Sequence, residues 1–348
     1  AGLWILRPQF ESGRGYHFFS LLSVCVSSQN PKYGSQNHTG MAVKQFMGYA
    51  KWWILSKCGR KNPLVITMGI GYACNLRCRH CHIDSMLKAN PGIKAAQTYD
   101  EIVTDLRERY ESGARIAYFE GGETTIWRDG DKDLGDLIDA AKSIGYYNVG
   151  YTTNGTTGRI FTNSDVISVS LDGPKAVHDY VRGDGAYDKL MDTLSGLEFS
   201  GRVYANMVLQ KGNLEHIREV VEIVKSNPRL AGIVFNFIPP PPYELLPTPE
   251  EKRRAIDEIA SLKREGFPIL NSKKGLELLA EEDWGSRCPK YLSAFTMPDG
   301  SRKNGCPSEG TESCRHCGYD AVREYYLIDR GSPATILEMF PVFARSKS

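Results

Sequence analysis

Three cysteines with the spacing of cluster ligands lie in one short stretch of this chain. Cys74, Cys78 and Cys81 form a C-x3-C-x2-C pattern directly after the apolar run at residues 64–70. Three thiolates can hold three irons of a [4Fe–4S] cube and leave the fourth iron without a protein ligand. An iron with an open position can bind a small molecule, whereas a fully ligated cluster can only transfer electrons. The pattern therefore predicts an enzyme in which these cysteines are both metal ligands and catalytic residues.

This spacing resembles the signature of the radical S-adenosylmethionine (SAM) superfamily. In that family the open iron chelates the amino and carboxylate groups of SAM, and one electron breaks a carbon–sulfur bond to release a 5′-deoxyadenosyl radical. The resemblance implies a [4Fe–4S] cluster, SAM as its ligand, and a flavodoxin or ferredoxin as low-potential electron donor. The alternative is a zinc site in which His80 or His82 supplies a fourth ligand.

A glycine pair followed by a carboxylate comes after the next apolar run, at residues 115–119. Gly121 and Gly122 let the backbone approach a ligand closely. The sequence resembles the G-G-E-P motif of the family, with Thr124 in place of proline. The resemblance implies that Gly121, Gly122 and Glu123 bind the cofactor and that Glu123 receives the SAM ammonium group.

Polar residues also end the following two strand candidates. Asn154 follows residues 147–152, while Ser170 and Asp172 end the run at 166–171. The resemblance implies that these side chains meet the ribose and methionine parts of SAM. Ordinary turn chemistry is the alternative, because Asn-Gly and Asp-Gly pairs favour tight turns.

Two further residues take roles from the same resemblance. Arg182 lies where many relatives place an arginine near the SAM carboxylate, which a guanidinium can hold through two parallel hydrogen bonds. A solvated surface arginine is the alternative. His80, just before Cys81, lies at a position that is usually aromatic in the family, and we expect it to border the adenine.

A second group of cysteines lies near the end of the chain, and a Pro-Asp-Gly turn at residues 298–300 predicts a hairpin within it. Four thiolates can fully ligate a [4Fe–4S] cube. The arrangement resembles the auxiliary-cluster module called twitch, a shorter form of the SPASM module. Structural zinc is the alternative, since four cysteines with one C-x-x-C pair suit that metal as well. The four residues are Cys288, Cys306, Cys314 and Cys317.

Composition limits the function classes. The chain has 348 residues and a net charge of +2, which gives no general attraction to nucleic acid. No stretch approaches the ~20 apolar residues of a membrane-spanning helix. The nine cysteines are odd in number and grouped like metal ligands. Because such ligands must stay reduced, we expect a cytoplasmic protein.

Short apolar runs alternate with helical patterns from residue 64 onward, which is typical of a parallel α/β protein. Six strand–helix units predict an open, partial (β/α)6 barrel, with its active site at the carboxyl ends of the strands. The strand candidates are 64–70, 115–119, 147–152, 166–171, 202–209 and 231–238, and the helix candidates are 99–112, 133–144, 186–198, 214–226 and 249–265.

We expect four segments along the chain. Residues 1–40 are polar and loop-like in their second half and read as a poorly ordered or non-native leader, with Met41 as a natural start. An amphipathic helix follows at residues 41–61, then the radical SAM barrel at 62–267 and the auxiliary-cluster module at 268–348. The aromatic residues and lysines of the helix suit a membrane surface, whereas packing across the barrel is the alternative.

The substrate is not determined by these residues. The order of basic helix, barrel and cysteine tail resembles radical SAM proteins of lipid pathways, which implies a membrane lipid or isoprenoid and peripheral membrane contact. A peptide-modifying maturase is the alternative within the family, because SPASM and twitch modules are common there. The alternative from another class is a non-catalytic zinc-dependent binding module.

Overall fold

The computed structural model describes residues 39–343, apart from 82, 84–86, 88–91 and 241. The chain divides into two compact units, residues 1–47 and residues 48–348. Helix α2 (Thr39–Lys57) begins in the first unit and ends in the second. Almost all of the expected leader at residues 1–40 lies outside the described part. Within that part, no helix is long and apolar enough to cross a membrane.

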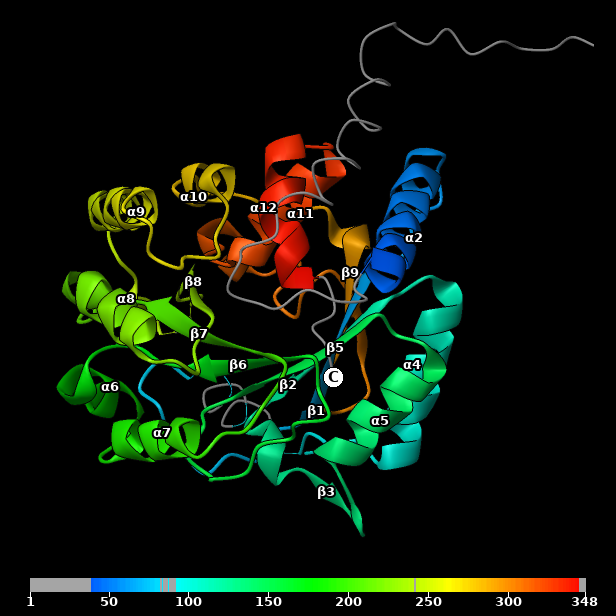
Figure 1. Cartoon of the computed structure of the whole chain (residues 1–348), viewed down its shortest axis with the longest axis horizontal. Helices are drawn as coiled ribbons and strands as arrows, with labels where there is room; N and C mark the ends of the chain where they lie inside the picture. Colours follow the sequence, from blue (N-terminus) through cyan, green and yellow to red (C-terminus); the bar gives the residue numbers. More distant parts are fainter. Residues whose placement is uncertain (1–38, 82, 84–86, 88–91, 241, 344–348) are drawn as a thin grey trace, which may run out of the picture. The chain divides into compact units, whose positions relative to one another are not determined.

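Parallel strands form the centre of the second unit (Figure 1). Neighbours in the sheet follow the order of the chain, and each pair is parallel, as right-handed strand–helix repeats require. All six expected strands are present, and the partial barrel predicted from the sequence is confirmed. They are β1 (Val65–Gly71), β2 (Ile116–Gly121), β5 (Asn148–Thr153), β6 (Val166–Ser170), β7 (Arg202–Leu209) and β8 (Gly232–Phe237).

Helices connect these strands. Capping boxes start three of them: Thr98 with Glu101, Asp133 with Asp136, and Thr248 with Glu251. Helix α6 has only eight residues, too few for a clear apolar period, and was not expected from the sequence. The connecting helices are α4 (Tyr99–Ser112), α5 (Leu134–Ile144), α6 (Lys175–Arg182), α7 (Ala186–Ser195), α8 (Ile217–Ser226) and α9 (Pro249–Arg264), with a small hairpin of β3 (Arg128–Asp129) and β4 (Lys132–Asp133) before α5.

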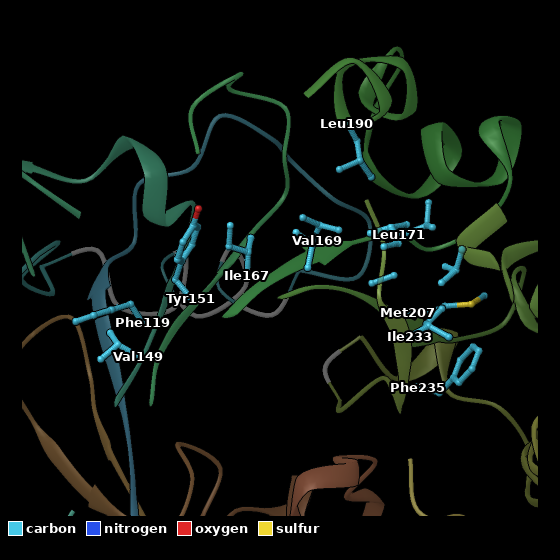
Figure 2. Packing of buried hydrophobic residues seen from close by; sticks show 14 of the residues in the cluster. Phe119, Val149, Tyr151, Ile167, Val169, Leu171, Leu190, Met207, Ile233 and Phe235 are labelled. Carbon is cyan, nitrogen blue, oxygen red and sulfur yellow. The ribbon is translucent and has the colours of Figure 1, made fainter. Parts of the chain in front are cut away.

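The two faces of the sheet differ in chemistry because side chains alternate along each strand. The apolar face packs against the helices, and Figure 2 shows part of it: Phe119, Val149, Tyr151, Ile167, Val169, Met207, Ile233 and Phe235. Positions between these residues face the barrel interior. Several of them are polar and keep some accessible surface: Tyr118, Glu120, Thr152, Asn206 and Asn236. The inward face of the sheet therefore carries polar side chains that keep part of their surface accessible.

The segment after α9 extends the same sheet. Strand β9 (Ser293–Thr296) pairs in parallel with β1, and β10 (Arg302–Asn304) returns antiparallel to β9, which confirms the hairpin expected at residues 298–300. The remaining helices here are α10 (Lys273–Leu279), α11 (Asp320–Asp329) and α12 (Pro333–Phe343). The second cysteine group is thus built onto the barrel edge.

The two tryptophans of α2 make stacking contacts and hydrogen bonds inside the second unit. Trp52 is 8% exposed, stacks on Tyr291 and donates its indole N–H to the Asn62 carbonyl oxygen (3.0 Å). Trp53 donates to the carbonyl oxygen of Ile328 (3.0 Å). This arrangement agrees with a helix that packs on the barrel, which was the alternative to a membrane-surface helix.

This packing leads to a prediction about stability. We expect Trp52→Ala to lower the free energy of unfolding by about 3 kcal/mol, because it removes a large buried side chain and a hydrogen bond. Ile54 is 50% exposed on the same helix, so Ile54→Ala should cost less than about 0.5 kcal/mol. Urea unfolding of both variants measures the difference, and equal losses would show that the helix is not packed as described.

Candidate functional site

The cysteine loop after β1 is pressed against the loop after β2. The Gly122 amide donates to the Gly71 carbonyl oxygen, and the Glu123 amide donates to that of Ala73 (both 2.8 Å). A Cβ at Gly121 would collide with the Gly71 carbonyl oxygen, and one at Gly122 would collide with that of Ala73. Only glycines allow this backbone-to-backbone approach. The glycine pair therefore fixes the position of the cysteine loop.

The three thiols of this loop influence one another. Burial is the main cause of a raised pKa at Cys74 and at Cys78, where it reaches about 11, and the negative charge of Cys81 adds to both. Among the described residues, no three side chains are already arranged as the ligands of one metal ion. Irons at separate corners of a cube would each take one thiolate and stabilise its deprotonated form, so the donor set fits a [4Fe–4S] cluster.

A buried ion pair joins the end of α6 to the turn after β6 and lies beside the cysteine loop. The Arg182 Nε donates to Asp172 Oδ2 (2.6 Å), and its Nη1 lies 4.0 Å from Cys78 Sγ. Asp172 is 0% and Arg182 8% exposed. The Val208 amide donates to the other carboxylate oxygen (2.9 Å). Burial raises the pKa of Asp172, but the Arg182 charge, with a contribution from the Val208 hydrogen bond, holds the pKa below its usual value.

A histidine that the sequence did not single out supports this pair. The Asp172 amide donates to Nδ1 of His178 (3.2 Å), which therefore carries no proton. Burial, followed by the nearby Arg182 charge, lowers the pKa of His178 to about 4. The neutral imidazole of His178 accepts this hydrogen bond and so stabilises the turn after β6. Arg182 then carries the positive charge that faces Asp172.

The Glu123 carboxylate accepts several hydrogen bonds from residues near the strand ends. One carboxylate oxygen accepts from the Thr125 amide (3.1 Å), the Thr125 hydroxyl (2.6 Å) and the Thr153 hydroxyl (2.7 Å). The other accepts from the Asn154 amide (2.7 Å). Asn154 in turn donates to the side chain of Asn75 in the cysteine loop (2.9 Å). These bonds fix the carboxylate between the segments that follow β2 and β5, and its contact with an ammonium group stays a prediction.

The remaining expected residues lie around the same strand ends. Ser170 ends β6 and is almost fully buried. His80 lies close enough to Asp172 to contribute to the lowered pKa of that carboxyl group. His82 lies outside the described residues. The structure thus brings the first cysteine group, the glycine pair, Glu123, Asn154, Asp172 and Arg182 to one end of the barrel.

A second carboxylate, Glu120, was missed from the sequence. It occupies the last inward-facing position of β2 and keeps part of its surface accessible. Burial alone raises its pKa to about 7. Because Glu120 directly precedes the glycine pair, its sequence context indicated a residue of the turn. Only the register of β2 shows that it faces the lumen.

The second cysteine group gathers beside the barrel. Burial, followed by the charges of Cys306, Cys317 and Cys314, raises the pKa of Cys288 to about 12. Arg323, which is 0% exposed, donates to Cys317 Sγ (3.2 Å) and to the Cys317 carbonyl oxygen (2.8 Å). A fully buried guanidinium needs negative charge beside it, and metal-bound thiolates supply such charge.

The segment after Cys317 docks on β8. The Phe237 amide donates to the Gly318 carbonyl oxygen (2.9 Å), and a Cβ at Gly318 would lie 2.5 Å from that of Phe237. The Asp320 amide donates to Oδ1 of the lumen residue Asn236 (2.8 Å). The second cysteine group is thereby held next to the barrel interior.

Comparison with known proteins agrees with this geometry. The family model of the radical SAM superfamily matches residues 68–224. The mycofactocin maturase MftC of Mycobacterium tuberculosis is 29% identical over 171 residues, which are 46% of this chain and 41% of MftC. An AdoMet-dependent heme synthase of Oleidesulfovibrio alaskensis is 26% identical over 188 residues, 50% of this chain and 46% of that protein. The chain thus spans less than half the length of these curated relatives.

Solved structures show the same fold. Streptococcus suis SuiB bound to S-adenosylmethionine matches with a TM-score of 0.57 at 16% identity, over 92% of this chain and 81% of SuiB. The protein anSMEcpe, with bound AdoMet and the Kp18Cys peptide, matches with a TM-score of 0.56 at 15% identity, over 79% of this chain and 84% of that one. At these identities the likeness concerns the fold.

Proposed function

We propose that the protein reductively cleaves SAM and uses the resulting radical on a peptide, because the family model of the radical SAM superfamily matches residues 68–224 of this chain. The observation that carries the proposal is the locking of the loop with Cys74, Cys78 and Cys81 against the Gly-Gly-Glu loop. When bound, the cluster and SAM supply the one-electron cleavage and the 5′-deoxyadenosyl radical. The protein supplies ligands, orientation and exclusion of water.

The chain's own residues divide this work. The three thiolates hold irons, and the glycine pair offers backbone groups to SAM at close range. Arg182 has its Nε committed to Asp172, so its remaining N–H groups serve the SAM carboxylate and the Cys78 thiolate. We assign the ammonium of SAM to the loop around Glu123. Its adenosine part is assigned to Asn154, Ser170 and His80.

The lumen supports a polar substrate. A pocket for an isoprenoid or lipid chain would be lined mainly by apolar side chains. Here Tyr118, Thr152, Asn206 and Asn236 face the interior, with Glu120 among them. Among the related proteins, MftC is named a maturase, and SuiB is known in complex with its precursor peptide SuiA. A peptide substrate agrees with both observations.

The lipid substrate suggested by the leading helix has less support. The indole N–H groups of its two tryptophans are donated to carbonyl oxygens within the second unit, and Trp52 is buried there. We therefore leave peripheral membrane contact out of the proposal.

We also propose that Cys288, Cys306, Cys314 and Cys317 hold an auxiliary [4Fe–4S] cluster, with zinc as the competing metal. The buried Arg323 beside Cys317 supports bound thiolates over free thiols. A fully ligated cluster at this place serves electron transfer or braces the substrate side of the barrel. A low-potential donor of the flavodoxin or ferredoxin type completes the electron path.

Anaerobic reconstitution tests these assignments. We expect about four irons per cluster site and dithionite-dependent 5′-deoxyadenosine from the native chain. Cys78→Ala should lose the nucleoside product completely, because an iron corner loses its ligand. Cys314→Ala is the matched control: it should lose the iron of the second site and keep SAM cleavage. Undiminished 5′-deoxyadenosine from Cys78→Ala would refute the proposal.

A further inference from the structure

Glu120 is placed to meet the substrate. Phe119 packs in the core between sheet and helices (Figure 2). Because side chains alternate along β2, its neighbours Tyr118 and Glu120 face the opposite way, toward the barrel interior. Glu120 directly precedes the glycine pair that positions the cysteine loop. A group bound at this carboxylate would therefore lie next to the proposed SAM site.

Among the residues that the structure describes, no cation pairs with the carboxylate of Glu120. Burial is the one cause of its raised pKa, with no contribution from a neighbouring charge or hydrogen bond. Within the described residues, no ion pair or hydrogen bond involves its side chain. Part of its surface is nonetheless accessible. A carboxylate that is enclosed, unpaired and reachable is a strong site for a positively charged ligand, because an isolated buried charge is costly.

Tyr118 lies two residues before Glu120 on β2 and therefore on the same face of the sheet, and two further tyrosines are close enough to feel the charge of Glu120. Burial is the main cause of a raised pKa at Tyr118, Tyr319 and Tyr325, and the negative charge of Glu120 raises each of them further. Tyr319 and Tyr325 belong to the segment that the Gly318 and Asp320 backbone contacts dock on β8. A carboxylate with aromatic rings near it is the environment that binds ammonium and guanidinium groups, through charge and through the faces of the rings.

We propose that Glu120, together with Tyr118, Tyr319 and Tyr325, forms a binding site for a cationic side chain of the substrate. This inference rests on the proposed function, since the ligand is a lysine or arginine of the peptide that the enzyme modifies. Binding of the cation keeps Glu120 ionised and so releases the proton that the empty site holds in part at neutral pH. The site thereby selects which residue of the peptide lies beside SAM.

Carbodiimide coupling tests the site without a known peptide. The reconstituted holoenzyme is treated near neutral pH with a water-soluble carbodiimide and one of two amines: ethylenediamine, which keeps a positive charge, or taurine, which carries a sulfonate. The activated carboxyl forms an amide with the amine and releases a urea. Peptide mass spectrometry then gives the ratio of the two adducts at Glu120 and at the exposed reference carboxylate Glu250.

We expect the ethylenediamine-to-taurine ratio at Glu120 to exceed that at Glu250 several-fold. Glu120→Gln should abolish the adduct at this position, which verifies its assignment, and Tyr325→Leu should reduce the ratio. Equal ratios at the two positions, or no adduct at Glu120 with either amine, would overturn the inference. The coupling needs neither enzymatic turnover nor peptide. A failure of SAM cleavage would therefore count against the proposed function, whereas the adduct ratio at Glu120 tests the cation site separately.

Discussion

A single methyl group at Gly122 is expected to separate the cysteine loop from the loop after β2. The Cβ of Gly122→Ala would lie 2.5 Å from the Tyr72 carbonyl oxygen and closer still to that of Ala73. Both obstacles are backbone atoms, so no side chain can rotate away, and the loops must move apart. We expect a loss of about 1–3 kcal/mol of stability. We also expect most of the iron of the first site to be lost on reconstitution.

Gly196→Ala provides the matched control. Gly196 has a right-handed helical conformation, and the nearest atom to its added Cβ is 3.8 Å away. This variant should keep both its iron content and its melting temperature. Iron analysis and thermal unfolding of the two proteins give the comparison. Full iron loading in Gly122→Ala would show that the glycine pair does not set the position of the cysteines.

The second large effect concerns the Asp172–Arg182 pair. Asp172→Ala removes the partner of an almost fully buried guanidinium, and breaking such a pair costs about 3–5 kcal/mol. On neighbouring elements, Lys175 and Asp188 form an ion pair whose side chains are 58% and 55% exposed. Asp188→Ala should cost about 1 kcal/mol or less, because solvent screens the pair. Urea unfolding that shows similar losses for the two variants would contradict the buried pair.

The pH dependence of the same variants follows from the lowered pKa of Asp172. A carboxyl group whose pKa is lower in the folded state stabilises the fold above its unfolded pKa, and this stabilisation is lost as the pH falls through the folded pKa. The native chain should therefore lose stability on acidification more steeply than Asp172→Ala. Unfolding measured from neutral to acid pH gives the two slopes.

Local sequence patterns predicted much of the barrel. Each central strand is a β-branched or apolar run, and the Thr98 and Thr248 capping boxes mark helix starts, so local chemistry was enough. The two cysteine groups could also be recognised from the sequence, because cysteines at such spacing are typical ligands of iron–sulfur clusters.

What the sequence did not reveal depends on contacts distant along the chain. Strand β9 is short and pairs with β1 from far along the sequence, which no local pattern indicates. The lumen-facing position of Glu120 follows from the register of β2. The partnership of Arg182 with Asp172, and the role of His178 beside it, follow from the short helix α6, which no local pattern predicted.

The central claim is that one iron of the first cluster is open and takes SAM as its ligand. Electron paramagnetic resonance of the reduced cluster tests it, in the Cys314→Ala protein so that the second site contributes least. We predict that SAM changes the spectrum, and that SAM labelled with ¹⁵N at its amino group adds a hyperfine coupling. A reduced cluster whose spectrum is the same with and without SAM, or a protein that binds only zinc, would contradict the account.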